Sequence, residues 1–320
     1  MKLIIPASIR ADIEPRLAHL APECALVCVD DDGIPDGDLS DADMYFRWWT
    51  PTPTFLKVLK QAPNVRWVHT PSAGVDHLLS SPELAASDIQ LTNSAGAHAG
   101  PIAEFVMLYM LFHVKRAREL LDTRGHAAWL WEEREELGEL AGKTVLLIGF
   151  GAIGQEIARR AQAFGMRVIA SRRTPAPAPG IDMVVGTDGW RDLLPQADFV
   201  VIAAPLTEAT HAMFGAGELA RLGPGAYLIN IARGAILDQA ALISALKAGQ
   251  LAGAALDVTE PEPPPDDDPI WDTPNVWVTP HISGSSPRTR ERQFDIFFDN
   301  LLRYRARQPL RNLVNKEAGY

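Results

Sequence analysis

The sequence predicts an α/β fold with two domains, each built on a parallel sheet. The chain has 320 residues, which suggests about two domains at roughly 100–200 residues per domain. In both halves, short apolar runs alternate with helix-like segments, as in parallel sheets whose strands are joined by helices. The apolar fraction is 47% and the charged fraction is 22%, which is ordinary for a soluble globular protein. Disordered, collagen-like and membrane-spanning classes are therefore excluded.

The first part of the chain has the alternation expected of a parallel sheet. The predicted strands are residues 3–5, 25–29, 44–48, 65–69 and 89–93. Helical patterns lie between them, for example at 53–61 and 75–80. Because parallel strands need a crossover connection, these helices are expected to join neighbouring strands.

A single long helix is predicted for residues 101–123. Pro101 suits the first helical turn, and an apolar stripe at helical spacing follows it. The stripe consists of Ala103, Val106, Met107, Met110, Leu111 and Val114. Such a helix would connect two α/β regions. The acidic segment 129–139, with Trp129 and Trp131, could be an arm that contacts a second copy of the chain, or it could pack on its own domain.

A second series of apolar runs begins at Lys143. The predicted strands are residues 144–148, 167–170, 199–203, 227–231, 254–258 and 276–279. A last helix is predicted over 289–307. Because one hydrophobic core rarely grows beyond about 250–300 residues, this helix could return to the first region.

The charge balance and the cysteines exclude several kinds of partner. Asp plus Glu is 40 and Lys plus Arg is 30, so the formal net charge is −10, which argues against binding nucleic acid or an anionic membrane. Cys24 and Cys28 are too few for a disulfide framework or a four-ligand zinc site, so we expect reduced core residues and no metal. The apolar run at 3–5 is shorter than the roughly 7–15 residues of a signal peptide, and 105–114 is shorter than the roughly 20 residues that cross a bilayer. A cytoplasmic protein is expected.

A glycine-rich turn follows the strand predicted at 144–148. Gly149, Gly151 and Gly154 form a GxGxxG pattern between that strand and a helical pattern, and a second strand comes next. Gly149 would permit the tight turn, Gly151 would let the backbone approach a pyrophosphate, and Gly154 would let helix and strand pack closely. Ala152 and Ile153 would offer backbone N–H groups at the helix start. This context predicts a Rossmann-type dinucleotide site; the alternative is a glycine turn without a cofactor.

The residues after the second strand bear on which dinucleotide is bound. An NAD-binding domain usually has Asp or Glu about 20 residues after the first glycine. Here that position is Ser171, followed by Arg172 and Arg173. A carboxylate would repel a 2′-phosphate, whereas Ser and Arg donate hydrogen bonds to it. The sequence therefore predicts a preference for NADP(H), with NAD(H) possible; the alternative is that both arginines are solvated surface charges.

Three polar residues each follow a predicted strand in the second region. They are Arg233, Glu262 and His281. Loops after parallel strands lie at one edge of the sheet, where ligands bind. An Arg fork matches a carboxylate, a His can transfer a carbonyl proton, and a Glu would orient the imidazolium. Each residue taken alone could instead be structural or a surface charge.

Several motifs, in order and spacing, resemble the D-isomer-specific 2-hydroxyacid dehydrogenase family. They are the glycine pattern at 149–154, Asn-Ile-Ala-Arg-Gly at 230–234, Leu-Asp-Val-Thr-Glu-Pro-Glu-Pro at 256–263 and Thr-Pro-His-Ile at 279–282. The resemblance runs from about residue 65 to the C-terminus. The endings 312–315 and 318–320 resemble the glyoxylate/hydroxypyruvate reductase branch. The resemblance implies two domains with Rossmann-like or flavodoxin-like parallel sheets: a discontinuous substrate domain, 1–98 and 288–320, and an inserted dinucleotide-binding domain, 99–287.

The resemblance also implies residue roles in the second region. Arg233 matches the arginine that binds the substrate carboxylate and carbonyl, and His281 matches the acid/base. Glu262 matches its carboxylate partner; Glu260 is an alternative, but the family's glutamate lies five residues after the Asp of the Asp-Val pair, Asp257. Asp257 matches the residue that holds the nicotinamide carboxamide.

Other positions follow from the same resemblance. In the first region, Ala73, Gly74 and Val75 match a loop that binds the substrate carboxylate through backbone N–H groups, although the segment could be a plain turn. Trp48 could contribute to the substrate side-chain pocket, as could Trp49, but buried packing is an equal alternative. The loop with Pro205 and Thr207 resembles the one that covers the cofactor. A homodimer is implied as well.

These inferences together predict an NADP(H)-preferring 2-hydroxyacid dehydrogenase that reduces a small 2-keto acid. Glyoxylate, hydroxypyruvate, pyruvate and phenylpyruvate present the same carboxylate and carbonyl, so the substrate side chain stays open. One alternative is a relative acting on formate or phosphite, but the formate branch replaces the glutamate that Glu262 matches. Another is a dinucleotide-sensing interaction protein on the same fold, which the acidic charge balance disfavours.

Overall fold

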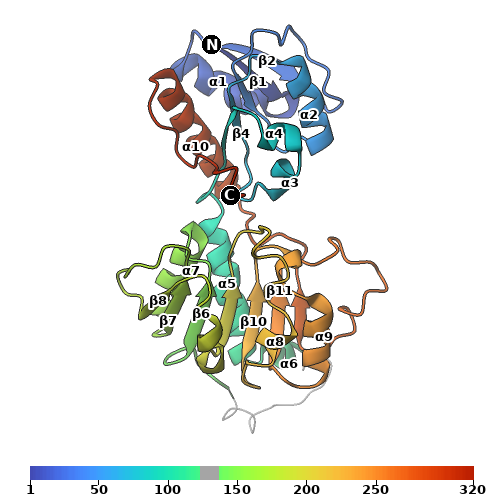
Figure 1. The fold of residues 1–320 in the computed structure, drawn as a ribbon, viewed down its shortest axis with the longest axis vertical. Coiled ribbons are helices and arrows are strands. Elements are labelled where there is room, and N and C mark those ends of the chain that lie inside the picture. Colours follow the sequence, from blue (N-terminus) through green and yellow to red (C-terminus); the bar gives the residue numbers. More distant parts are fainter. Residues whose placement is uncertain (123–136) are drawn as a thin grey trace. The chain divides into compact units, whose positions relative to one another are not determined.

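The chain divides into two units, each with its own sheet (Figure 1). The structure is a computed structural model that describes residues 1–122 and 137–320. Unit 1 comprises Met1–His98 and Ser286–Tyr320, and unit 2 comprises Ala99–Ser285. Unit 1 is therefore built from both ends of the chain, with unit 2 inserted in its sequence.

Unit 1 contains a five-stranded sheet in which every strand pairs in parallel with its neighbours. The strand order is β2-β1-β3-β4-β5, which is the flavodoxin-like arrangement. The strands are β1 (Lys2–Pro6), β2 (Ala25–Val29), β3 (Met44–Phe46), β4 (Trp67–His69) and β5 (Gln90–Thr92). The predicted α/β class with parallel strands is confirmed in this unit.

The helices of unit 1 come from both ends of the chain. They are α1 (Arg10–Leu20), α2 (Thr52–Gln61), α3 (Asp76–Leu79), α4 (Pro82–Ala85) and α10 (Pro287–Arg305). Helix α10 begins sharply because the Ser286 side chain accepts a hydrogen bond from the Thr289 N–H and Pro287 occupies the first turn. Figure 1 shows α10 in red beside α1, and Arg16 of α1 forms an ion pair with Asp295 of α10.

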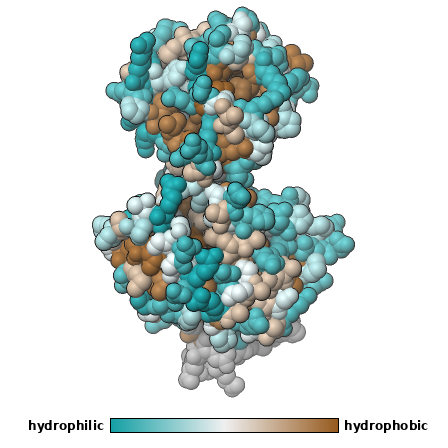
Figure 2. Space-filling model, viewed as in Figure 1, coloured by the Kyte–Doolittle hydropathy of each residue, from teal (hydrophilic) through white to brown (hydrophobic). Residues whose placement is uncertain are grey.

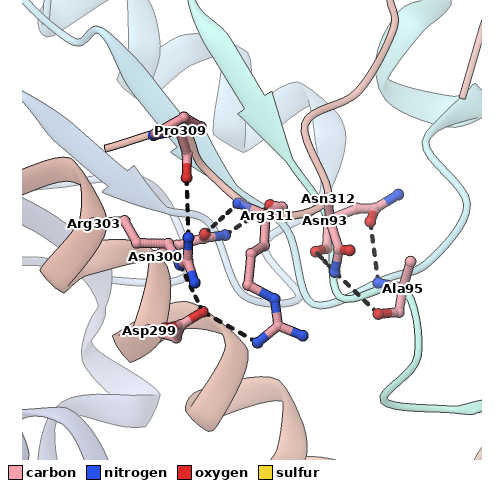
Figure 3. A network of polar contacts seen from close by, with 8 residues as sticks. All are labelled: Asn93, Ala95, Asp299, Asn300, Arg303, Pro309, Arg311 and Asn312. Atoms are coloured by element: carbon pink, nitrogen blue, oxygen red, sulfur yellow. Dashed lines mark hydrogen bonds and ion pairs between the residues drawn. The ribbon is translucent and has the colours of Figure 1, made fainter. Parts of the chain in front are cut away.

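The segment that follows α10 is tied to the N-terminal part of unit 1 (Figure 3). The Asn300 side chain accepts from the Arg311 N–H at 2.7 Å and donates to the Arg311 carbonyl at 3.0 Å. The Asn312 side chain donates to the carbonyl oxygens of Asn93 and Ala95, which follow β5. These bonds fix the chain end against the loop after β5, as the drawn network shows.

Unit 2 contains a seven-stranded parallel sheet with the order β12-β11-β10-β9-β6-β7-β8. Its strands are β6 (Thr144–Ile148), β7 (Arg167–Ser171), β8 (Met183–Val185), β9 (Phe199–Ile202), β10 (Tyr227–Asn230), β11 (Gly253–Leu256) and β12 (Val276–Val278). The chain order reverses between β6 and β9, which makes their carboxyl ends the switch point where ligands bind in such sheets. The predicted Rossmann-like sheet is confirmed.

Both faces of the second sheet are covered, so its central strands β6, β9, β10 and β11 are buried throughout. Val145 and Leu147 of β6 pack into one core cluster with α5 (Ala99–Val114) and α7 (Ala152–Ala163). Leu146 and Ile148 pack into the other cluster with α9 (Gln239–Lys247) and α8 (Ala216–Leu219). Alternate residues of one strand thus serve two cores, which explains why β6 is continuously apolar.

The prediction of a single helix over 101–123 is wrong. The structure has α5 (Ala99–Val114) and a separate α6 (Ala117–Asp122). Arg116 between them has a φ of 50°, a left-handed conformation that cannot continue a right-handed helix. The Gly138 N–H donates to the Val114 carbonyl at 2.8 Å and so satisfies an acceptor at the end of α5. Most of the acidic segment 129–139 lies outside the described residues.

The surface mixes hydrophilic and hydrophobic residues. On the face drawn in Figure 2, both units show hydrophobic patches among hydrophilic residues. The exposed large apolar residues include Ile34, Trp49, Trp271 and Leu313. Within the part of the chain that the structure describes, every helix is too short or too polar to cross a bilayer.

Candidate functional site

The glycine-rich turn lies at the switch point of the second sheet. Gly149 has a φ of 108°, and a Cβ there would lie 2.6 Å from the carbonyl carbon and oxygen of Ala203, which follows β9. A Cβ on Gly154 would lie 2.4 Å from the Gly149 carbonyl oxygen. Both contacts are with backbone atoms, so side chains are excluded at these two positions. The turn can approach β9 and α7 this closely only because glycine occupies positions 149 and 154.

Gly151 differs from Gly149 and Gly154 because the space beside its Cα is open. A Cβ at Gly151 would meet no atom within 4 Å. Gly151 is the N-cap of α7, and the first helical hydrogen bond runs from the Gln155 N–H to the Gly151 carbonyl. The N–H groups of Ala152 and Ile153 precede that bond, so they point out of the helix start. An open, positively polarised cradle of this kind fits a dinucleotide pyrophosphate.

The residues at the end of β7 form the next part of this edge. Ser171 is 4% exposed, and its hydroxyl donates to the Gly186 carbonyl at 3.3 Å. Arg172 donates from Nη2 to the Ala176 carbonyl at 2.7 Å, while its buried Nε has no hydrogen-bond partner in the described chain. Arg173 is exposed. An orphaned guanidinium donor next to the glycine turn fits an additional phosphate on the cofactor.

The loop after β9 is folded on itself. The Thr210 hydroxyl donates to the Pro205 carbonyl at 2.7 Å, and the Thr207 N–H donates to the Thr210 hydroxyl oxygen at 2.8 Å. The loop follows Ala203, the residue that contacts Gly149. Pro205 and Thr207 therefore lie on the neighbouring strand end, beside the glycine turn.

Arg233 is positioned by a buried asparagine at the end of β10. Asn230, fully buried, donates from Nδ2 to the Arg233 carbonyl and accepts from the Ala232 N–H. A Cβ on Gly234 would lie 2.0 Å from the Thr259 carbonyl oxygen. The loop that carries Arg233 is thus packed, backbone against backbone, on the loop that follows β11 and leads to Glu262.

Glu262 and His281 meet directly. His281 Nδ1 lies 2.6 Å from Glu262 Oε1, and the side chains are 47% and 41% exposed. An ionised carboxylate only accepts hydrogen bonds, so Nδ1 carries the proton of this bond. The other nitrogen, Nε2, is then the position at which a proton can be exchanged with a ligand. The backbone of His281 has a φ of 51°, a strained conformation for a residue with a Cβ.

The loop that holds His281 is fastened by a buried carboxylate. Asp257 is 1% exposed; its Oδ1 accepts from the Thr279 hydroxyl at 2.7 Å and from the Ile282 N–H at 3.0 Å. Its Oδ2 accepts from both the N–H and the hydroxyl of Ser283, and its backbone carbonyl accepts from the His281 N–H. A nicotinamide carboxamide would have to share or replace one of these donors, so the contact predicted for Asp257 stays a prediction.

A tyrosine on α5 extends this network, and the sequence analysis misses it. The Tyr109 hydroxyl lies 2.6 Å from the Thr279 hydroxyl. Because Thr279 donates its only hydroxyl proton to Asp257, Tyr109 must be the donor in this bond. Burial raises the pKa of Tyr109 to about 12, so the donor stays protonated. A tyrosine within an apolar helix stripe is indistinguishable from a core residue by sequence pattern.

In unit 1, the loop over residues 73–75 offers a row of backbone donors. Within the described chain, the N–H groups of Ala73, Gly74 and Val75 donate no hydrogen bond. The Ala73 carbonyl is held by the Asn93 side chain at 2.7 Å, which fixes the loop. Successive backbone N–H groups that donate no other hydrogen bond can bind an anion.

Trp48 lies in the core of unit 1. It is 6% exposed and stacks on Phe294 of α10 with ring centroids 4.8 Å apart. Trp49 is 53% exposed. The packing alternative accounts for the Trp48 ring as the structure places it, and a substrate contact by Trp48 stays a prediction.

The structure therefore brings the predicted residues of unit 2 to one edge of one sheet. Strands β10, β11 and β12 are neighbours, and the loops after them carry Arg233, Glu262 and His281 respectively. The glycine turn and the Arg172 loop follow β6 and β7 of the same sheet. A His–Glu pair, an arginine and a glycine-rich turn share this edge, which is an arrangement that could serve redox chemistry on an anionic substrate.

A family model matches most of unit 2. Residues 107–283 match the D-isomer specific 2-hydroxyacid dehydrogenase, NAD binding domain. A glyoxylate reductase from Thermococcus gammatolerans is 36% identical over 82% of this chain and 79% of its own. A glyoxylate reductase from Korarchaeum cryptofilum is 34% identical over 83% of this chain and 80% of its own.

Solved structures with the same fold cover the whole chain. An NADPH-dependent glyoxylate/hydroxypyruvate reductase from Sinorhizobium meliloti, in complex with NADP and sulfate, is 31% identical with a TM-score of 0.83, over 100% of this chain and 99% of its own. A D-isomer specific 2-hydroxyacid dehydrogenase from Xanthobacter autotrophicus, in complex with NADPH and MES, is 28% identical with a TM-score of 0.84, over the same shares.

Proposed function

The chain belongs to the D-isomer specific 2-hydroxyacid dehydrogenase family, and from this premise we propose that it is an NADP(H)-preferring reductase of small 2-keto acids such as glyoxylate or hydroxypyruvate. As a member of that family it is an oxidoreductase that uses a nicotinamide cofactor. The observation that carries the proposal is the 2.6 Å contact of His281 with Glu262, at the sheet edge that also carries Arg233 and the glycine turn.

The proton in the proposed reaction comes from His281. A nicotinamide cofactor held at the glycine turn would supply the hydride that the carbonyl carbon of the substrate receives. The imidazolium of His281 donates from Nε2 to the carbonyl oxygen, since Nδ1 is held by Glu262. Glu262 keeps the ring oriented and stabilises its positive charge. In the oxidative direction, neutral His281 takes the proton back at the same nitrogen.

The substrate carboxylate is assigned to Arg233, whose planar fork can make two parallel hydrogen bonds to a carboxylate. The backbone N–H groups of Ala73, Gly74 and Val75, in unit 1, are proposed separately as donors to an anion. Replacing Arg233 by Ala should therefore lower kcat/KM for a 2-keto acid more than it weakens NADPH binding.

The preference for NADP(H) is assigned to the end of β7. The orphaned Nε of Arg172 and the exposed Arg173 supply positive charge where a 2′-phosphate would bind, and no carboxylate occupies the position of Ser171. The Ser171 hydroxyl can turn from the Gly186 carbonyl toward that phosphate, because its present bond is long at 3.3 Å.

The test uses NADPH and NADH with glyoxylate and hydroxypyruvate, following the absorbance of the reduced nicotinamide. We expect turnover with a lower KM for NADPH. Arg172→Ala should raise the KM for NADPH by about 10- to 100-fold, as expected for lost charge-assisted hydrogen bonds, and leave that for NADH unchanged. The matched control is Arg167→Ala, because Arg167 lies at the opposite end of β7. An unchanged cofactor ratio in Arg172→Ala refutes the assignment, and no turnover with any 2-keto acid refutes the function.

We also propose that the protein is a homodimer. Helices α5 and α6 expose Leu108, Leu120 and Leu121, which are 44%, 44% and 47% exposed. Large apolar side chains exposed on these two helices could contribute to an interaction surface. Light scattering coupled to size exclusion should give twice the chain mass of 34.9 kDa, and the monomer mass at micromolar concentration refutes the proposal.

A further inference from the structure

The loop that carries Glu262 has few backbone donors of its own. Four of the nine residues from 260 to 268 are prolines, which have no N–H. The Glu262 side chain is 41% exposed, and His281 is its one hydrogen-bond partner in the part of the chain that the structure describes. The place of this carboxylate is therefore set by the course of its loop rather than by contacts of its own.

One end of this loop is tied to helix α9 (Gln239–Lys247). The Glu260 N–H donates to Oε1 of Gln239 at 3.2 Å. Gln239 is the first residue of α9, and the preceding Asp238 caps that helix by accepting from the Ala241 N–H at 2.9 Å. Because the cap fixes the first turn, the Gln239 side chain starts from a defined position. It reaches the loop two residues before Glu262.

The other end of the loop is held by the same side chain. Gln239 Nε2 lies 3.3 Å and 3.4 Å from the two carboxylate oxygens of Asp268. Asp268 Oδ1 also accepts from the N–H of Ile270, which is fully buried in a core cluster of unit 2. This end is therefore anchored in the core. The side-chain amide of Gln239 accepts on one side and donates on the other, which neither a carboxylate nor an ammonium group can do.

Glu262 lies on the short arc between these two ties. At the start of the arc, the Thr259 hydroxyl donates to the Pro261 carbonyl at 2.8 Å. Each proline in the arc fixes its own φ, so the arc has little freedom once its ends are held. The arc brings the Glu262 carboxylate to His281, with Oε1 2.6 Å from Nδ1. A bridge between the two ends is thus well placed to set this contact.

We propose that Gln239 is a positioning residue for the reaction: by bridging the two ends of this loop, it aligns the Glu262 carboxylate with His281. The inference rests on the proposed reductase function and adds a residue that acts on it through the loop alone. Binding of NADPH should not depend on Gln239, because the glycine turn follows β6, which is separated from β11 by β9 and β10. The rate should depend on it, since small displacements of catalytic groups are costly.

The first test is Gln239→Ala, measured at saturating NADPH with glyoxylate or hydroxypyruvate. We expect kcat to fall by about 3- to 30-fold, as for one or two lost hydrogen bonds, while the dissociation constant of NADPH stays within about twofold. In a Glu262→Gln background the same substitution should change kcat by less than about twofold, because the group that it positions is gone. Gln250→Ala is the matched control, since Gln250 is exposed beyond the C-terminal end of α9.

An exchange of groups between Gln239 and Asp268 separates bridging from folding. Gln239→Glu keeps an acceptor for the Glu260 N–H but sets a carboxylate against Asp268, so the two ends repel and kcat should fall. Helix α9 is not weakened, because an acidic residue in the first turn suits the helix dipole. Adding Asp268→Asn restores a donor opposite an acceptor and keeps an oxygen for the Ile270 N–H, so kcat should return to within about threefold of wild type.

The possible failures are distinguishable. A wild-type kcat in Gln239→Ala, an equal loss with and without Glu262, or a double variant that does not recover overturns the role of Gln239 and leaves the reductase function standing. If Gln239→Ala does not fold, the comparison of Gln239→Glu with the double variant decides alone. A wild type that binds NADPH and reduces no 2-keto acid overturns the proposed function, and this inference with it.

Discussion

At the residue scale, the orientation of His281 is set by two unrelated constraints. Glu262 fixes the ring by accepting at Nδ1, and the backbone is held in a left-handed conformation with a φ of 51°. Neither constraint acts through burial, because both side chains are more than two-fifths exposed. An exposed His–Glu pair in water contributes little to folding stability, so this geometry is better explained by proton transfer than by stability.

We expect His281→Gln to abolish most of the reductase activity. Glutamine can still bond to Glu262 but cannot release a proton, so kcat should fall by about 100- to 10,000-fold, the range for a general acid. His19→Gln on the exposed face of α1 is the control. A His281→Gln variant with more than a tenth of the wild-type activity contradicts this role.

At the element scale, the loop after β12 is positioned from helix α5. The chain of donors runs from the Tyr109 hydroxyl to the Thr279 hydroxyl and on to Asp257 Oδ1, over 2.6 and 2.7 Å. Asp257 in turn holds the N–H groups of Ile282 and Ser283, on the C-terminal side of His281. Each bond in the chain removes freedom from the loop that presents the imidazole, so we expect the Tyr109 hydroxyl to influence the proposed catalysis by positioning this loop.

Tyr109→Phe tests this positioning role by removing one oxygen atom. A neutral hydrogen bond contributes about 0.5–1.5 kcal/mol, so kcat should fall by roughly 2- to 12-fold while the dissociation constant of NADPH stays the same. Tyr227→Phe is the matched control, because Tyr227 of β10 is a buried tyrosine of the same unit whose hydroxyl makes no hydrogen bond to the described residues. In a His281→Gln background the effect of Tyr109→Phe on activity should vanish. An equal effect in both backgrounds means that Tyr109 supports the fold rather than the imidazole.

A Gly→Ala substitution should have different effects on stability and on NADPH binding at two positions of the glycine turn. In Gly151→Ala the new methyl group meets open space, so Tm should stay within about 2 °C while the dissociation constant of NADPH rises at least tenfold, because the methyl occupies the cradle at the start of α7. In Gly149→Ala the methyl would lie 2.6 Å from the Ala203 backbone at a φ of 108°, so Tm should drop by several degrees even without cofactor. Calorimetry and NADPH fluorescence titration measure both, and equal losses of Tm would contradict the difference.

The elements that sequence pattern predicts are those with a strong local cause. The strands of both sheets are short apolar runs, and the fingerprint glycines stand at a fixed spacing between a strand and a helix. The break at Arg116 has no such cause, because the apolar stripe continues up to Val114 and the interruption depends on Gly138, which is distant in sequence. Tyr109 could not be assigned either, since its significance lies in the hydroxyl group that its own hydroxyl meets in space.

At the scale of the whole molecule, the two units differ in whether their core residues come from one continuous segment of the chain. Unit 2 is continuous, and its two core clusters draw only on residues within 99–285. Unit 1 is discontinuous, and one of its clusters includes Phe294, Phe297, Phe298 and Leu301 of α10. The aromatic contacts across this junction are close, with the Phe46 and Phe297 centroids 4.3 Å apart. The N-terminal sheet therefore depends on the last helix of the chain for its core.

We expect residues 99–285 alone to fold cooperatively and to bind NADPH, while residues 1–98 alone do not fold. Losing four buried side chains from α10, each contributing about 1.5–3 kcal/mol, removes a stabilisation comparable to the whole stability of a domain. A fusion of 1–98 to 286–320 through a flexible linker should restore cooperative unfolding, because it returns α10 and the Asn312 contacts with the loop after β5. Circular dichroism and urea titration of the three proteins test this. A cooperative transition in 1–98 alone would show that the first sheet does not need α10.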